Sequence, residues 1–140
     1  MSAALLVRVR DAIAADAAIT DFFTGRYGKP LGHLIGYDKG SPNAKDRPLF
    51  CYIAARQKYN KTTSRVLAQG SIVIQVIEKE TTDGVRDGVV VADQAARLLI
   101  DFLKKSPVSD GFSDFGVVTD LGTQHPFYEI EVVFNYYYRA

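Results

Sequence analysis

The stretch from residue 126 to residue 139 alternates between an apolar face and a mixed face. The apolar face consists of Tyr128, Ile130, Val132, Phe134, Tyr136 and Tyr138. The mixed face consists of Phe127, Glu129, Glu131, Val133, Asn135 and Tyr137. Because successive side chains of a strand point to opposite sides, this alternation predicts one long strand. A single strand cannot bury its apolar face alone, so the rest of the chain must supply neighbouring strands and a cover.

Apolar residues at spacings of three and four predict that this cover is a helix over residues 83–105. The apolar stripe of the helix consists of Val85, Val89, Ala92, Ala96, Leu99 and Leu103. Thr82 or Asp83 supplies the expected N-cap, and a Ser-Pro pair at 106–107 follows the end of the helix. We therefore expect this helix to lie across the apolar face of the C-terminal strand.

The beginning of the chain predicts one helix, one short helical turn and a long loop. Residues 3–15 carry apolar side chains at helical spacing. Asp16 is placed to cap a second turn over residues 17–23, which we expect Gly25 to end. Glycines and prolines recur through residues 24–48, and this predicts a long loop. The loop lacks the spacing of a phosphate-binding motif, so we expect an arm that reaches a neighbouring molecule rather than a nucleotide site.

Two further strands are predicted at residues 49–55 and 66–78, joined as an antiparallel hairpin by a long polar tip. Gly70 within the second strand indicates a bulge or bend. A short strand is expected around residues 115–119, and together with the C-terminal strand it makes a second hairpin. These elements predict an α+β fold, with a mainly antiparallel sheet of about four strands and two main helices packed on it. We expect residues 1–140 to form a single domain of this kind.

Composition narrows the classes of function. The chain has 140 residues, a formal net charge of +1 and one cysteine, Cys51. The near-neutral charge gives no general attraction to nucleic acid or to anionic membranes, and a single cysteine excludes an intrachain disulfide and a cysteine zinc cluster. The first ten residues do not show the pattern of a signal peptide, and no run is long and apolar enough to span a membrane. We therefore expect no membrane partner and no specific nucleic-acid partner.

Candidate catalytic and metal-ligating residues are few. His33 and His125 lie in separate loops without a partner at metal-ligand spacing, so we expect solvated or capping histidines. Cys51 lies within an apolar strand, where a thiol is usually inert. Glu129 and Glu131 share a strand face; paired carboxylates can perform acid–base chemistry, but a solvated face or a partner surface explains them more simply. We expect no catalytic residue, no metal, no cofactor and no enzymatic activity.

The residues that stand out suit a subunit of an assembly. The hairpin tip carries four positive charges without an acid between them: Arg56, Lys58, Lys61 and Arg65. Glu78 and Glu80 lie at the opposite end of the second hairpin strand. Three tyrosines crowd the C-terminus: Tyr136, Tyr137 and Tyr138. Tyrosines are enriched at interfaces because they bury area while keeping a hydroxyl solvated. A solvated tip is the simpler interpretation of the basic charges; the alternative is a head-to-tail ring in which basic and acidic patches of neighbours meet.

Four segments occur in an order that a known family shares. They are residues 5–19 leading into the glycine-rich loop, 47–53, 98–103 and 127–132. In this order the chain resembles the tail-terminator, or tail-completion, proteins of long-tailed bacteriophages. The likeness covers nearly the whole chain as a pattern of elements, without a signature motif. It implies a tail-terminator-like α+β domain that acts as a non-enzymatic virion subunit, forming a hexameric ring that caps the tail tube.

The resemblance also implies partners and a location. The expected partners are further copies of the chain, the tail tube protein and the neck or connector protein, with DNA passing through the ring without specific contact. The expected location is the tail or neck of the virion, after assembly in the host cytoplasm. Two alternatives stay open. One is another neck or head-completion protein of the same virion, and the other is a small α+β enzyme or ligand-binding domain with the glycine-rich loop as a lid.

Overall fold

The computed structural model describes residues 2–105 and 111–139 of the chain. Within these ranges the helices are α1 (Ser2–Ala14), α2 (Ala17–Tyr27) and α3 (Asp87–Lys105). The main sheet consists of β1 (Gly32–Ile35), β2 (Leu49–Tyr59), β3 (Arg65–Ile77), β6 (Phe112–Val118) and β7 (Phe127–Arg139). A separate small hairpin consists of β4 (Thr81–Thr82) and β5 (Val85–Arg86). The fold is α+β as predicted, although the described main sheet has five strands rather than about four.

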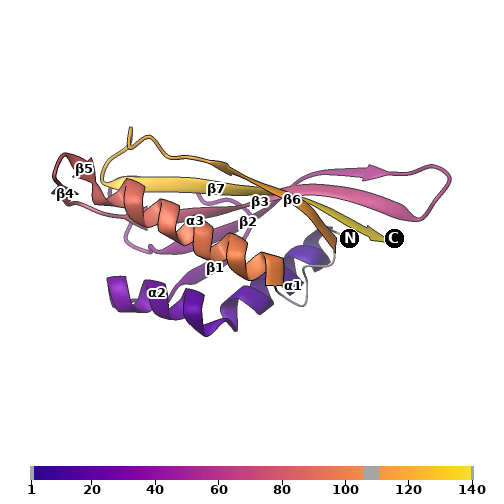
Figure 1. The fold of residues 1–140 in the computed structure, drawn as a ribbon, viewed down its shortest axis with the longest axis horizontal. Helices are drawn as coiled ribbons and strands as arrows, with labels where there is room; N and C mark the ends of the chain where they lie inside the picture. Colours follow the sequence, from indigo (N-terminus) through magenta and orange to yellow (C-terminus); the bar gives the residue numbers. More distant parts are fainter. Residues whose placement is uncertain (1, 106–110, 140) are drawn as a thin grey trace.

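The strand order in the main sheet is β1-β2-β3-β7-β6, with β1 parallel to β2 and the other neighbours antiparallel. Strand β7, which has the most regular alternation in the sequence, therefore lies between two partners inside the sheet. Figure 1 shows a long twisted sheet with the helices on one face. The hairpin of β2 and β3 projects beyond the helices at one end of the molecule, and the β4–β5 hairpin forms the other end (Figure 1).

The apolar face of β7 is buried beneath α3, as predicted. Ile130 is 1% exposed and shares one hydrophobic cluster with Leu99 and Leu103 of α3. The other two helices extend this cover over β2, where Phe23 meets Phe50 edge-on at 5.3 Å between ring centroids. Full burial of one large aliphatic or aromatic side chain is worth about 1.5–3 kcal/mol, so this helix–sheet layer is the main source of stability.

Helix α3 begins at Asp87, later than the sequence pattern predicted. Asp83 and Gly84 have positive φ angles of 52° and 77°, and Thr82 pairs with Val85 across them. An Asp-Gly pair in this conformation is a favoured two-residue hairpin turn, so the turn displaces the start of the helix. Val85 therefore lies in β5, is half exposed and does not belong to the apolar stripe. The buried positions of α3 are Gly88, Val91, Ala92, Ala95, Ala96, Leu99 and Leu103.

Helix α2 runs through Gly25 and ends at Tyr27, with Gly28 as its C-cap, so the predicted end was at the wrong glycine. The start is as predicted, because the carboxylate of Asp16 accepts a hydrogen bond from the N–H of Ile19 at 3.0 Å. Gly28 has a φ of 66°, a left-handed conformation that glycine adopts without strain, and its N–H donates to the carbonyl of Thr24 at 2.9 Å. The segment predicted to be loop thus completes a helix and then adds β1 to the sheet.

The hairpin of β2 and β3 is longer in its paired part than predicted. Pairing continues as far as Tyr59 opposite Val66, so the connection is reduced to residues 60–64. Much of the basic segment that appeared to be a loop therefore lies on strand β2. The short strand expected around residues 115–119 is β6, which begins earlier, at Phe112.

A bulge interrupts the pairing of β2 with β3. The register shifts between Ala54 and Arg56, so Ala55 is the extra residue. Gly70 lies opposite Ala54, and a Cβ at Gly70 would approach the carbonyl oxygen of Ile53 to 2.5 Å. The predicted irregularity is confirmed at this place, although the extra residue belongs to β2 and not to the strand that contains the glycine.

Candidate subunit interface

The sheet face that points away from the helices has a covered half and an open half. Residues 36–48 cover the first half. The phenol of Tyr37 donates to the carboxylate of Glu129, with distances of 2.9 and 2.8 Å to the two oxygens. The side-chain amide of Gln75, which is fully buried, donates to the carbonyl of Asp38 and to Glu129, each at 2.8 Å. Burial and the hydrogen bond to Glu129 raise the pKa of Tyr37 to about 12.

An ion pair and an aromatic ring hold the same segment in place. Arg47 is buried and donates to the carboxylate of Asp38 at 3.1 Å. Its guanidinium also lies 6.0 Å from the ring centroid of Phe127. Gly40 lies so close to that ring that a Cβ would come within 2.1 Å of it. Residues 36–48 therefore pack on their own sheet, and the prediction that this loop extends as an arm is wrong.

The part of the chain that does project is the segment of residues 56–65, which we call the arm (Figure 1). Its four predicted cations are all exposed: Arg56, Lys58, Lys61 and Arg65. None of them forms an ion pair with another described residue. Asn60 orders the tip, because its side-chain oxygen accepts hydrogen bonds from the N–H groups of Thr62 and Thr63 at 2.9 and 3.1 Å. Of the four cations, Lys61 lies on this ordered turn, whereas Arg56 and Lys58 lie on β2 and Arg65 on β3.

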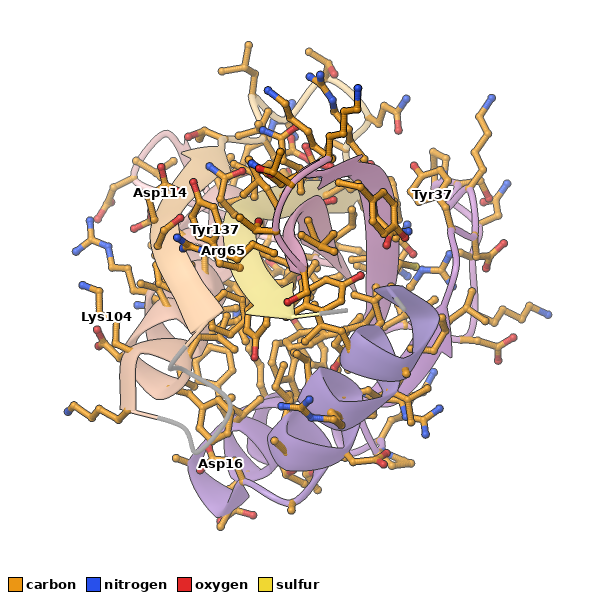
Figure 2. The ribbon with its side chains drawn as sticks, turned by 90° about the vertical axis from the view of Figure 1, so that its right-hand side faces the viewer. Asp16, Tyr37, Arg65, Lys104, Asp114 and Tyr137 are labelled. Atoms are coloured by element: carbon orange, nitrogen blue, oxygen red, sulfur yellow. The ribbon has the colours of Figure 1, made fainter. Side chains whose placement is uncertain are left out.

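The three C-terminal tyrosines have different environments. Tyr136 lies within the hydrophobic core, so it serves packing rather than a surface. The hydroxyl of Tyr138 donates to the side-chain oxygen of Gln57 at 2.8 Å. Tyr137 lies on the other face of the sheet and is 42% exposed, with the guanidinium of Arg65 at 5.1 Å from its ring centroid (Figure 2). Of the three, Tyr137 is the one most accessible to a partner.

The acidic patch predicted at the far end of β3 is partly neutralised within the chain. Glu78 accepts a hydrogen bond from Nε of Arg26 at 2.6 Å, and only 10% of its side chain is exposed. This hydrogen bond is the main cause of the raised pKa of Arg26. Glu80 is exposed beside the β4–β5 hairpin, at the end of the molecule opposite the arm (Figure 1). Glu80 is therefore better placed than Glu78 to meet a partner.

The open half of the sheet face forms a groove of about 450 Å³, which we call the acidic groove. Its polar lining consists of Gln69, Ser71, Asp114, Glu131 and Asn135. Asp114 accepts a hydrogen bond from the amide of Asn135 at 2.6 Å, and Glu131 accepts one from Ser71 at 2.9 Å. Neither carboxylate has an ion-pair partner among residues 2–105 and 111–139.

The sequence pattern placed Glu131 on a mixed strand face, but it gave no indication that Asp114 lies nearby. The two residues come together because Asp114 of β6 pairs with Asn135 of β7, and Glu131 lies on the same face of β7. A hairpin of this short strand with the C-terminal strand was expected and is confirmed, but its register, which sets Asp114 opposite Asn135 and so creates the groove, was not predicted.

The residues considered for chemistry are engaged in packing. The ring Nδ1 of His33 lies 2.8 Å from the hydroxyl of Tyr52, and burial is the main cause of the lowered pKa of His33. His125 pairs in the same way with Tyr128. Cys51 is fully buried, and that burial raises the pKa of its thiol. Within the described ranges no three His, Cys, Asp or Glu side chains are grouped to hold a metal ion, and no helix is long and apolar enough to cross a membrane.

Comparisons with known proteins give a likeness in fold alone. No protein-family model matches the chain, and no curated protein matches it. Among solved structures, the chain is similar to a component described as the virion of a native gene transfer agent particle, with a TM-score of 0.58 and 13% sequence identity. The similarity covers 94% of this chain and 92% of that one. Near-complete coverage at such low identity shows that the two chains share one architecture from end to end.

Proposed function

We propose that this protein is a structural subunit of a bacteriophage-like virion. The observation that carries the proposal is the end-to-end similarity in fold to a component of a gene transfer agent virion. Fold alone does not determine function, so the resemblance of the sequence pattern to phage tail proteins is the second support. The projecting arm and the exposed charges on it agree with a chain that binds other subunits rather than a small substrate.

Within that class, the proposed role is a tail terminator. In this role, copies of the chain form a hexameric ring that caps the tail tube and joins it to the neck or head connector. DNA would pass through the ring without sequence-specific contacts. A ring needs a heterologous interface, in which two different surfaces of one chain meet. The arm and the acidic surfaces lie on different parts of this chain and therefore satisfy that requirement (Figure 1).

Two other functions predict different observations. Another neck or head-completion protein would have the same fold and differ only in its place on the particle. A small enzyme or ligand-binding domain would need the glycine-rich loop as a movable lid. Residues 36–48 instead cover the sheet face with buried contacts, including the ion pair of Arg47 with Asp38, and this weakens the enzyme alternative.

Immuno-electron microscopy of intact particles tests the proposed role. Antibodies raised against the purified chain should label particles at the junction between tail and head. Label along the tail or on the shell would refute the terminator role, and absence of the chain from purified particles would refute the virion role altogether. Light scattering at high protein concentration provides a second measurement. A hexamer would have about six times the 15.5 kDa mass of one chain.

A further inference from the structure

We infer that the arm of one copy docks in the acidic groove of a second copy. The arm carries the four exposed cations of the β2–β3 hairpin, and the groove carries the two carboxylates of Asp114 and Glu131. This contact is distinct from the head-to-tail contact that the sequence suggested, in which the arm would meet Glu78 and Glu80. It depends only on the described surfaces and does not require the virion role.

Charge complementarity is the first argument. Exposed charges of one sign, left without ion pairs inside the chain, are available to a partner of the opposite sign. The cations of the arm and Asp114 of the groove meet this condition, and the half-buried Glu131 likewise has no ion pair with another described residue. Glu78 does not meet it, because Arg26 already neutralises it within the chain. The groove is therefore a better receptor for the arm than Glu78, and the cross-linking experiment below decides between the groove and the exposed Glu80.

Shape and apolar surface are the second argument. The arm ends in a turn whose backbone is ordered by Asn60, so docking requires little further ordering. Tyr59 is 62% exposed beside this turn and offers an aromatic ring to a partner. The groove includes Val133 and Gly116, which give it an apolar floor between the two carboxylates. An aromatic anchor at the centre and a polar rim around it are typical of a specific protein interface.

The arm cannot fill the groove of its own chain. Its strands are continuous with the sheet that forms the groove, and Val66, next to the tip, is paired with both Tyr59 and Tyr138. Folding the arm back would break these ladders and leave backbone groups without hydrogen bonds. The groove is therefore open to an arm from elsewhere, and a second copy of this chain supplies an arm of matching charge.

Cross-linking between two variants that each carry one added cysteine tests the contact while keeping all charges. Ser64→Cys places a thiol on the tip of the arm, and Ala55→Cys places one at the groove; both positions are exposed and the natural Cys51 is buried. We expect an equal mixture treated with a short bis-maleimide to give a heterodimer. The matched control replaces Ala55→Cys by Thr81→Cys, an exposed position next to Glu80 at the far end of the molecule.

Preferential cross-linking of the arm to position 55 supports the inference. Equal or stronger cross-linking to position 81 would overturn it in favour of the contact with Glu80. Heterodimer formation no higher than that of unfolded protein would overturn it as well. Because the assay uses purified chain alone, its outcome is independent of where antibodies label a virion, and the two proposals can fail separately.

Charge reversal adds a functional readout. We expect Lys58→Glu with Lys61→Glu to lower the self-association constant at least about tenfold in sedimentation velocity at low salt, and Asp114→Lys with Glu131→Lys to do the same. Mixing the two double variants should restore association, because the reversed arm then faces the reversed groove. Failure of the mixture to associate would refute the pairing. Arm variants that lose binding to duplex DNA while keeping wild-type self-association would also refute it and identify DNA as the partner of the arm.

Discussion

Replacing Gly88 by alanine tests the packing of α3 on the sheet at its closest point. Gly88 lies in the first turn of α3, and a Cβ there would be 2.1 Å from two ring atoms of Tyr128. Tyr128 is fully buried and hydrogen-bonded to His125, so its ring has no free space to occupy. Adding a methyl group to a packed core costs about 1–3 kcal/mol, and a contact this short places the cost near the upper end.

Alanine is favoured over glycine by about 1 kcal/mol at an interior helix position; Gly88 is the second residue of α3, so this gain offsets the clash by at most that amount. We therefore expect Gly88→Ala to lower the free energy of unfolding by about 2 kcal/mol. Gly25 provides the matched control, since it lies inside α2 with nothing within 4 Å of an added Cβ. At Gly25 only the higher helix propensity of alanine changes the stability, so Gly25→Ala should raise the free energy of unfolding by about 0.5–1 kcal/mol.

Urea unfolding followed by far-UV circular dichroism measures both variants against the wild type. The free energies of unfolding of the two variants should differ by about 3 kcal/mol, which corresponds to roughly 10 °C between their melting temperatures. The slope of unfolding free energy against urea should stay unchanged, because neither substitution alters the area exposed on unfolding. If Gly88→Ala were as stable as Gly25→Ala, α3 would not lie on Tyr128, and the proposed cover of β7 would be refuted.

Two further predictions concern the core and the covered sheet face. Leu99→Ala removes a fully buried side chain and should lower the free energy of unfolding by about 2–5 kcal/mol, whereas Val90→Ala on the exposed side of the same helix should change it by less than about 0.5 kcal/mol in urea unfolding. The pKa of Tyr37 is raised to about 12 in the folded chain, whereas in the unfolded chain it is near 10. The protonated phenol of Tyr37 therefore contributes its full stabilisation below about pH 10, and this stabilisation is lost as the pH rises from about 10 to 12. The Tyr37→Phe variant should therefore lose less stability than the wild type across that interval, and parallel pH–stability curves would contradict the hydrogen bond to Glu129.

The helix–sheet layer could be predicted from the sequence because its signals are local and periodic. The alternation that ends in Tyr138 gives β7 its two faces, and the spacing that includes Leu99 gives α3 its buried side. The start of α3 was missed because helical spacing continues through Val85 by coincidence. The pair of Asp83 and Gly84 was the local signal of the hairpin, and it outweighs that spacing.

The open sheet face could not be predicted, because it depends on which segments meet. Glycines and prolines indicated a long loop at residues 24–48, but its contacts are made with residues far along the chain. Gly40 fits against Phe127, and Asp38 accepts from Gln75. Those contacts are set by packing, and no periodicity in the loop encodes them. The acidic groove was missed for a related reason, since Asp114 becomes significant only through the register in which β6 pairs with β7.

Two glutamates of β7 show how the fold separates internal structure from a surface for partners. Glu129 and Glu131 occupy equivalent positions on one strand face, and the sequence does not distinguish them. Glu129 accepts hydrogen bonds from Tyr37 and Gln75, because the loop of residues 36–48 ends over it. Glu131 lies beyond that cover and, among the described residues, accepts a side-chain hydrogen bond from Ser71 alone. A carboxylate with several donors is stabilised within its own chain, whereas one with a single donor gains more from an incoming cation. The edge of the loop therefore determines where the chain's own packing ends and the surface for a second copy begins.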